Sequence, residues 1–137
     1  MRIGQVAKSA GVHIETIRFY ERKGLIAQPP RNNGGYRQYP QEAVARIRFI
    51  KRAKDLGFSL TEIAELLSFQ ANPMATCADV KQRAEAKILA IQERVKDLQT
   101  MKHALGKLVE SCSGSGSLDH CPIIDCFEIH KEKEESP

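Results

Sequence analysis

The sequence predicts a mainly α-helical protein, in which a winged helix-turn-helix unit is followed by a long helix that pairs with a second copy as an antiparallel coiled coil. Two short amphipathic segments joined by Gly11 indicate the helix-turn-helix unit. An Asn-Gly-Gly turn between two short extended pieces indicates the wing. A proline-free stretch from Asp79 to Glu110, with apolar residues at alternating steps of four and three, indicates the coiled coil.

The first helix is predicted over residues 3–10 and the second over residues 13–22, with Gly24 as a left-handed stop. Ile14 and Ile17 are expected to hold the second helix against the rest of the unit. In a helix-turn-helix unit this helix enters the major groove, where its outward side chains meet base edges and phosphates. A small helical hairpin with a solvated charged face also fits the pattern. The side chains of this helix that we predict to contact DNA are Glu15, Thr16, Arg18, Tyr20 and Arg22.

The predicted wing is a small projecting hairpin around the turn at residues 33–35. Arginine and tyrosine side chains on such a hairpin suit contacts with phosphates. Tyr36 and Arg37 are the predicted DNA contacts, and Arg31 is carried on the same hairpin. Tyr39 is instead expected to pack on the helices. The alternative for the whole segment is a simple surface loop.

Two further helices complete the predicted DNA-binding domain, residues 1–70. Apolar residues at helical spacing from Ala43 to Ala53 predict a third, very basic helix, and Ser59 with Glu62 forms the capping box of a fourth. Residues 1–70 hold 12 Lys and Arg against 6 Asp and Glu, a net charge of +6, whereas residues 71–137 have a net charge of −2. The basic half is therefore the part expected to bind nucleic acid.

Residues 71–111 are predicted to form a linker and the long dimerisation helix. A single narrow apolar seam on a long helix requires another helix, and because the rest of the chain is short, we expect a second copy as the partner. Lys102 interrupts the seam. Only an antiparallel pair places Cys77 of one copy beside Cys112 of the other at both ends, which creates two equal sites. The seam residues are Ala84, Ile88, Ile91, Val95, Leu98, Leu105 and Val109.

The four cysteines are expected to act as thiols, because the sequence shows no membrane span or signal peptide and a cytoplasmic location follows by default. Cys77 and Cys112 lie roughly 50 Å apart along one helix, so they cannot bind one ion within one chain. Thiolates favour soft metals. Cys77 from one chain, with Cys112 and Cys121 from the other, can form a trigonal sulfur site, and Cys126 is a possible fourth ligand. Residues 112–137 are accordingly predicted to form a metal-binding loop and a C-terminal tail.

Three segments carry motifs of high specificity: ETIRFYERKGL at residues 15–25, GYRQY at residues 35–39 and LGFSLTEI at residues 56–63. In these motifs the chain resembles the MerR-family transcription regulators, and the resemblance continues through the long helix to Phe127. It implies a homodimer that sits on promoter DNA with or without metal. It also implies that metal binding distorts the DNA and aligns the promoter for RNA polymerase.

The spacings of 35 and 9 residues between Cys77, Cys112 and Cys121, together with Cys-Pro-Ile-Ile at residues 121–124, look like those of the mercury-responsive members. The resemblance therefore implies Hg(II) as the sensed ion. Lead and cadmium sensors share much of this spacing, so a Pb(II), Cd(II) or Zn(II) sensor is the alternative. A cytosolic thiol-redox sensor that uses Cys112, Cys121 and Cys126 for disulfides is an alternative of another class. No nucleophile–base pair, phosphate-binding loop or carboxylate pair indicates an enzyme.

Overall fold

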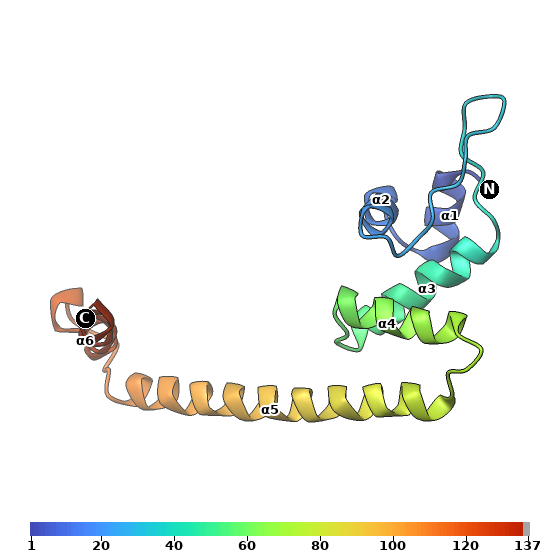
Figure 1. Ribbon diagram of the computed structural model, residues 1–137. Coiled ribbons are helices and arrows are strands. Elements are labelled where there is room, and N and C mark those ends of the chain that lie inside the picture. The colour runs from blue at the N-terminus through green and yellow to red at the C-terminus, as the bar shows by residue number, and fades with distance from the viewer. Residues whose placement is uncertain (136–137) are drawn as a thin grey trace. The chain divides into compact units, whose positions relative to one another are not determined.

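The structure is a computed structural model that describes residues 1–135, with side-chain environments up to residue 128. The described chain is mainly helical, as predicted (Figure 1). It divides into two compact units, Met1–Lys87 and the part from Ile88 onward. Within the described residues, no helix is long and apolar enough to span a membrane. The helices are α1 (Ile3–Ala10), α2 (Ile14–Arg22), α3 (Glu42–Asp55), α4 (Leu60–Ala71), α5 (Cys77–Glu110), the short 3₁₀ helix η1 (Leu118–His120) and α6 (Pro122–Glu135).

The core of the first unit is built from α1, α2, α3 and α4. Helix α1 packs on both α2 and α3, and α4 packs on α3. The apolar spacing from Ala43 to Ala53 marks the buried face of α3, as predicted, and α1 buries Val6, Ala7 and Ala10. Ile14 differs from the expectation, because it is the first residue of α2 and its side chain stays 36% exposed. The largest fully buried side chains are Val6, Ile17, Ile47, Ile50 and Ile63.

The turn between α1 and α2 depends on Gly11, which has a φ of 71°. A side chain is disfavoured in this left-handed region, and glycine enters it without a steric penalty. The backbone N–H of Val12 then donates to the carbonyl of Ala7 over 3.0 Å, which closes the end of α1. These contacts produce the helix-turn-helix geometry that the sequence predicts.

The wing loop, residues 27–39, is held by a single antiparallel bridge between Arg31 and Arg37. The Asn32 side-chain oxygen accepts hydrogen bonds from the backbone N–H groups of Gly34 at 2.9 Å and Tyr36 at 3.0 Å. An asparagine side chain that accepts from its own turn in this way stabilises the reversal locally. Tyr39, at the end of the loop, is only 3% exposed and packs in the core, as predicted.

Several cations of α3 donate to backbone carbonyls rather than projecting freely. Arg48 donates to the carbonyl of Ser9 over 2.7 Å, and Lys51 donates to that of Gly11 over 3.0 Å. Arg46 reaches the carbonyl of Leu25 over 2.9 Å. These carbonyls lie at the ends of α1 and α2, where no intrahelical partner is available. These three basic side chains therefore link α3 to the ends of α1 and α2.

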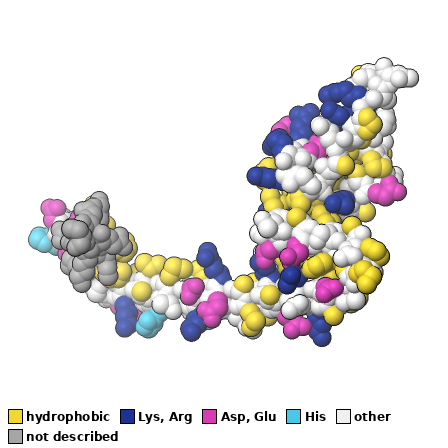
Figure 2. All heavy atoms as spheres, in the orientation of Figure 1, with side chains coloured by type: hydrophobic (Ala, Val, Ile, Leu, Met, Phe, Trp, Pro, Cys, Tyr) yellow, Lys and Arg dark blue, Asp and Glu magenta, His cyan; other side chains and the backbone are white. Residues whose placement is uncertain are grey.

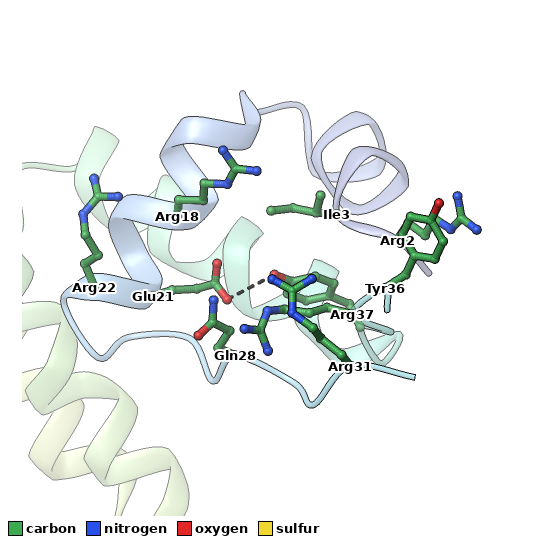
Figure 3. A pocket seen from close by; sticks show the side chains of 10 residues that line it. Arg2, Ile3, Arg18, Glu21, Arg22, Gln28, Arg31, Tyr36 and Arg37 are labelled. Carbon is green, nitrogen blue, oxygen red and sulfur yellow. Dashed lines mark hydrogen bonds between the residues drawn. The ribbon is translucent and has the colours of Figure 1, made fainter. Parts of the chain in front are cut away.

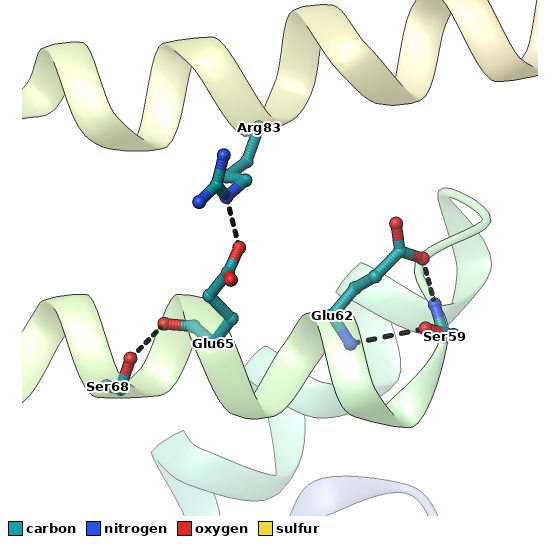
Figure 4. Close-up of polar contacts among 5 residues, drawn as sticks. All are labelled: Ser59, Glu62, Glu65, Ser68 and Arg83. Atoms are coloured by element: carbon teal, nitrogen blue, oxygen red, sulfur yellow. Dashed lines mark hydrogen bonds and ion pairs between the residues drawn. The ribbon is translucent and has the colours of Figure 1, made fainter.

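Helix α4 begins with the predicted capping box. The Ser59 side chain accepts from the backbone N–H of Glu62 over 3.2 Å, and the Glu62 carboxylate accepts from that of Ser59 over 2.8 Å (Figure 4). Two acidic residues of α4 also bind cations on the first turns of α5: Glu65 binds Arg83, and Glu62 binds Lys87. These ion pairs join the start of α5 to α4 within the first unit, which ends at Lys87.

Helix α5 runs without interruption from Cys77 to Glu110 and contains no buried residue. It begins two residues earlier than the predicted start at Asp79. Hydrophobic side chains follow one side of it in a line (Figure 2). The predicted seam is accordingly exposed in the single chain, and its large hydrophobic residues range from 44% exposed at Ile91 to 62% at Val109.

Beyond α5, the chain turns through Ser113–Ser117, where Gly114 and Gly116 have φ values of 78° and 101°. The 3₁₀ helix η1 follows this turn and leads into α6. Helix α6 continues further than predicted, because residues 128–135 are largely charged and indicate only a tail in the sequence. The last two residues of the predicted tail, 136 and 137, lie outside the described part of the chain.

Candidate DNA interface and metal-binding cysteines

A hollow of about 510 Å³ lies between α2 and the wing loop in the first unit (Figure 3). Helix α2 supplies one wall, the wing loop supplies the opposite wall, and the start of α1 contributes a third side. The residues that line it are Arg2, Ile3, Arg18, Glu21, Arg22, Gln28, Arg31, Tyr36, Arg37 and Tyr39.

Five of these residues are arginines and one is acidic, so the hollow has a strongly positive surface. Its acidic residue, Glu21, accepts a hydrogen bond from the Tyr39 hydroxyl over 3.1 Å. Burial and this hydrogen bond raise the pKa of Tyr39 to about 12. Tyr39 therefore stays protonated at neutral pH and joins the base of the wing loop to α2. The positive charge of the five guanidinium groups allows the hollow to bind an anion such as a DNA phosphate.

The wing loop is also held by contacts within it and by Arg2, the residue before α1. Arg37 donates to the carbonyl of Pro29 over 2.6 Å, and Arg31 donates to that of Gly35 over 2.8 Å. The guanidinium carbon of Arg2 lies 3.8 Å from the centroid of the Tyr36 ring, a cation–π contact. Arg2 is not predictable as a wing contact from the sequence, because an isolated arginine before a helix carries no motif. Only the folded chain brings it to the wing.

Four of the five predicted DNA contacts on α2 are at least partly exposed, and the fifth is buried. Arg18 and Arg22 line the hollow, while Glu15 is exposed and forms an ion pair with Arg18 at 3.0 Å. Thr16 is half-buried. The prediction for Tyr20 is wrong: its side chain is 5% exposed, lies in the core, and has a pKa raised first by burial. Its spacing of three residues from Ile17 puts both on the inner face of α2.

The two predicted wing contacts are both on the surface of the hollow. Tyr36 is 49% exposed. Arg37 is half-buried, since its guanidinium also supports the loop through Pro29. A recognition helix beside a projecting basic loop presents one element to the major groove and another to the flanking backbone.

The structure places the four cysteines at two different ends of α5. Cys77, the first residue of α5, is exposed and lies in the first unit. Cys112, Cys121 and Cys126 are half-buried and lie in the second unit. All four are free thiols. Among the described residues of the single chain, no three His, Cys, Asp or Glu side chains gather into a set that can hold a metal ion.

The helix-turn-helix, the wing loop and the basic hollow are together typical of a DNA-binding regulatory protein. Residues 1–70 match the family described as "MerR HTH family regulatory protein", and residues 44–108 match that described as "MerR, DNA binding". The chain belongs to the MerR family of transcription regulators. The family resemblance that the sequence motifs indicated is therefore confirmed.

Relatives with nearly equal identity carry different names. The chain is 44% identical over 124 residues to the mercuric resistance operon regulatory protein of Bacillus cereus, covering 90% of this chain and 94% of the relative. It is 42% identical over 125 residues to the HTH-type transcriptional regulator CueR of Salmonella typhimurium, covering 91% and 90%. Sequence identity alone therefore does not select one ligand.

Two solved structures share the fold over almost their whole length. The lead(II) complex of the regulator PbrR691 from Ralstonia metallidurans has a TM-score of 0.82 at 31% identity, covering 93% of this chain and 98% of the other. The mercury(II) complex of MerR from Bacillus megaterium has a TM-score of 0.71 at 39% identity, covering 93% and 99%. These similarities support the helix arrangement described above.

We predict that Arg18→Ala and Arg37→Ala each weaken binding to promoter DNA and make it less dependent on salt. Loss of one phosphate contact should reduce the slope of log affinity against log salt by about 0.9, because fewer counterions are released. Fluorescence anisotropy with a duplex recovered by in vitro selection measures both quantities. Arg94→Ala, which removes an exposed arginine from α5, is the control. Wild-type affinity and slope in both test variants would contradict this interface.

Proposed function

We propose that this protein is a metal-responsive transcription regulator that binds promoter DNA as a homodimer and senses Hg(II) through cysteine thiolates. The observation that carries the proposal is the position of the cysteines relative to α5. Cys77 is the first residue of this helix, Cys112 follows its last residue by two positions, and an exposed apolar seam lies between them. A second copy laid antiparallel covers the seam and brings Cys77 beside Cys112 of its partner at each end.

Each site then takes Cys77 from one chain and Cys112 with Cys121 from the other. Three thiolates form a soft, trigonal ligand set, which favours a soft ion such as Hg(II). The loop between Cys112 and Cys121 supports this arrangement, since the positive φ values of Gly114 and Gly116 let the chain reverse direction there. Cys77 is an exposed residue, so a partner chain can reach it.

The DNA end of the proposal rests on the basic hollow. Helix α2 enters the major groove, and the wing loop contacts the backbone beside it. Metal binding across the dimer changes the orientation of the two DNA-binding domains relative to each other. The promoter DNA bends or twists in response. Such deformation costs a few kcal/mol, a range that ligand binding can supply. RNA polymerase then uses the realigned promoter.

Pb(II) is the second candidate ion. Of the two metal complexes, the lead(II) complex of PbrR691 has the higher TM-score. In sequence, however, this chain is 31% identical to PbrR691 and 44% identical to the mercuric resistance regulator of Bacillus cereus. Cys126, half-buried in the second turn of α6, offers a fourth thiolate to an ion that takes more ligands, such as Cd(II) or Zn(II). The number of thiolates that the site uses therefore separates the candidates.

The direct test is a titration of the reduced protein with Hg(II), Pb(II), Cd(II) and Zn(II), followed by native mass spectrometry and transcription from the selected promoter. The proposal expects one tightly bound Hg(II) per chain and the strongest transcriptional response with that ion. A response to oxidant alone, with disulfides and no bound metal, would favour the thiol-redox sensor instead.

We predict that Leu98→Glu converts the dimer into monomers. The substitution forces two like charges into an apolar interface, where an unpaired charge is strongly disfavoured. Sedimentation velocity measures the change. Thr100→Glu adds the same charge two residues away, off the seam, and should leave the dimer intact. A dimeric Leu98→Glu variant would show that the seam is not the interface.

Cys126→Ser should keep the full response to Hg(II), because three thiolates already complete a trigonal site. Cys121→Ser, the matched substitution in the proposed site, should abolish that response. Transcription assays with increasing Hg(II) compare the two variants. An equal loss in both would mean that the site needs four thiolates, which favours Pb(II), Cd(II) or Zn(II).

The sharing of each site between chains has its own test, in which Cys77→Ala and Cys112→Ala chains are mixed. One end of the heterodimer keeps three thiolates, because Cys77 of the second chain meets intact Cys112 and Cys121 of the first. The other end lacks two. Isothermal titration should detect one tight Hg(II) site in the heterodimer and only weak binding in each mutant homodimer. A heterodimer that binds no better than the homodimers would exclude the shared antiparallel site.

A further inference from the structure

The first turns of α5, residues 77–87, belong to the same compact unit as the DNA-binding helices, although α5 has no buried residue. Apolar packing therefore contributes little to this attachment. The contacts that join α5 to α4 are instead made by two cations of α5, each bound to a carboxylate of α4. Cys77 lies six residues before the first of these cations on the same helix.

The first contact is made by Arg83. Its Nε donates to Oε1 of Glu65 (Figure 4). Its guanidinium carbon lies 5.7 Å from the centroid of the Phe69 ring, also on α4. Arg83 therefore meets an acidic group and an aromatic face on the same helix.

Lys87 makes the second contact, one helical turn further along α5. Its Nζ donates to Oε1 of Glu62 over 2.8 Å and lies 5.5 Å from the centroid of the Phe58 ring. The Lys87 side chain is only 16% exposed. The same Glu62 oxygen accepts the backbone N–H of Ser59, which fixes the carboxylate at the start of α4. The hydrogen bond from Lys87, together with that from Ser59, lowers the pKa of Glu62 to about 2.

Two contacts between α5 and α4 restrict the orientation of α5 more than a single contact does. A single contact lets a helix rotate about its axis, whereas contacts one turn apart on both helices fix its rotation and its position along α4. The Glu65–Arg83 pair is exposed, and exposed ion pairs stabilise a fold only weakly, so its main effect is on the position of α5. The two contacts hold the helix that begins with Cys77 in a defined orientation on the DNA-binding helices.

We propose that the Glu65–Arg83 and Glu62–Lys87 contacts transmit metal binding at Cys77 to the DNA-binding helices. The inference rests on the proposed function and names the residues that couple its two sites. An ion that pulls on Cys77 moves the first turns of α5, and the two contacts carry α4, and α3 packed beneath it, along with them. Without these contacts the protein still binds metal and DNA, but metal binding no longer changes the conformation of the bound DNA.

The test compares the double variant Arg83→Gln/Lys87→Gln with the control Arg94→Gln/Lys96→Gln, which removes the same charges from α5 beyond the contacts. Native mass spectrometry measures Hg(II) binding, and anisotropy measures binding to the selected duplex. A 2-aminopurine base at the centre of the duplex reports its distortion when Hg(II) is added. Circular dichroism checks that both variants fold. The exchange Arg83→Lys/Lys87→Arg keeps both cations in place.

We expect the test variant to bind Hg(II) and DNA like the control but to lose the Hg(II)-induced fluorescence change by about fivefold or more, the lower range of allosteric couplings. The exchange variant should recover most of the change. A full fluorescence change in the test variant overturns the inference, and so does loss of Hg(II) binding, which would assign the contacts to the metal site itself. A wild-type protein that does not respond to Hg(II) contradicts the proposed function, and the inference with it.

Discussion

Helix α5 is the constraint on which the rest of the structure depends, because it spans 34 residues without one buried side chain. In water a helix of this length needs tertiary packing for most of its stability. Its apolar seam, half-exposed at Val95 and Leu98, is the surface where that stabilisation is available. In the proposed dimer the second copy supplies it, and the seam then fixes where the terminal cysteines meet.

The DNA-binding unit has the opposite character, because its own core is complete. Fully buried isoleucines hold α2, α3 and α4 together, and the basic side chains of α3 satisfy carbonyls at the ends of α1 and α2. The wing loop is fixed by Asn32 and by the contact between Tyr39 and Glu21. The DNA-binding unit is thus followed by a helix that depends on a partner for its stability. The polar contacts of Arg83 and Lys87 hold the first turns of that helix against α4.

Much of this organisation was predictable because the signals are local. The capping box of Ser59 and Glu62 marks the start of α4, Gly11 marks the turn after α1, and helical spacing of apolar residues identifies the inner faces. Tyr20 was mistaken for a DNA contact because a tyrosine in a basic helix suits either surface, and only its place beside Ile17 in the core decides between them. The length of α6 was missed because a charged segment carries no apolar period to mark it.

The sequence by itself determined the helices up to α5, the capping box of α4, the apolar seam and the order of the cysteines, because each depends on residues within a few turns of one another. The tertiary structure decided which side chains face the hollow. Arg2 reaches Tyr36 across 34 positions, and Tyr39 reaches Glu21 across 18, and no local pattern specifies either contact. The same holds for Glu65 and Arg83, which meet only because the linker between α4 and α5 turns the chain back on itself. Such contacts follow from the packing of whole elements, which is set by the sum of many weak interactions rather than by a motif.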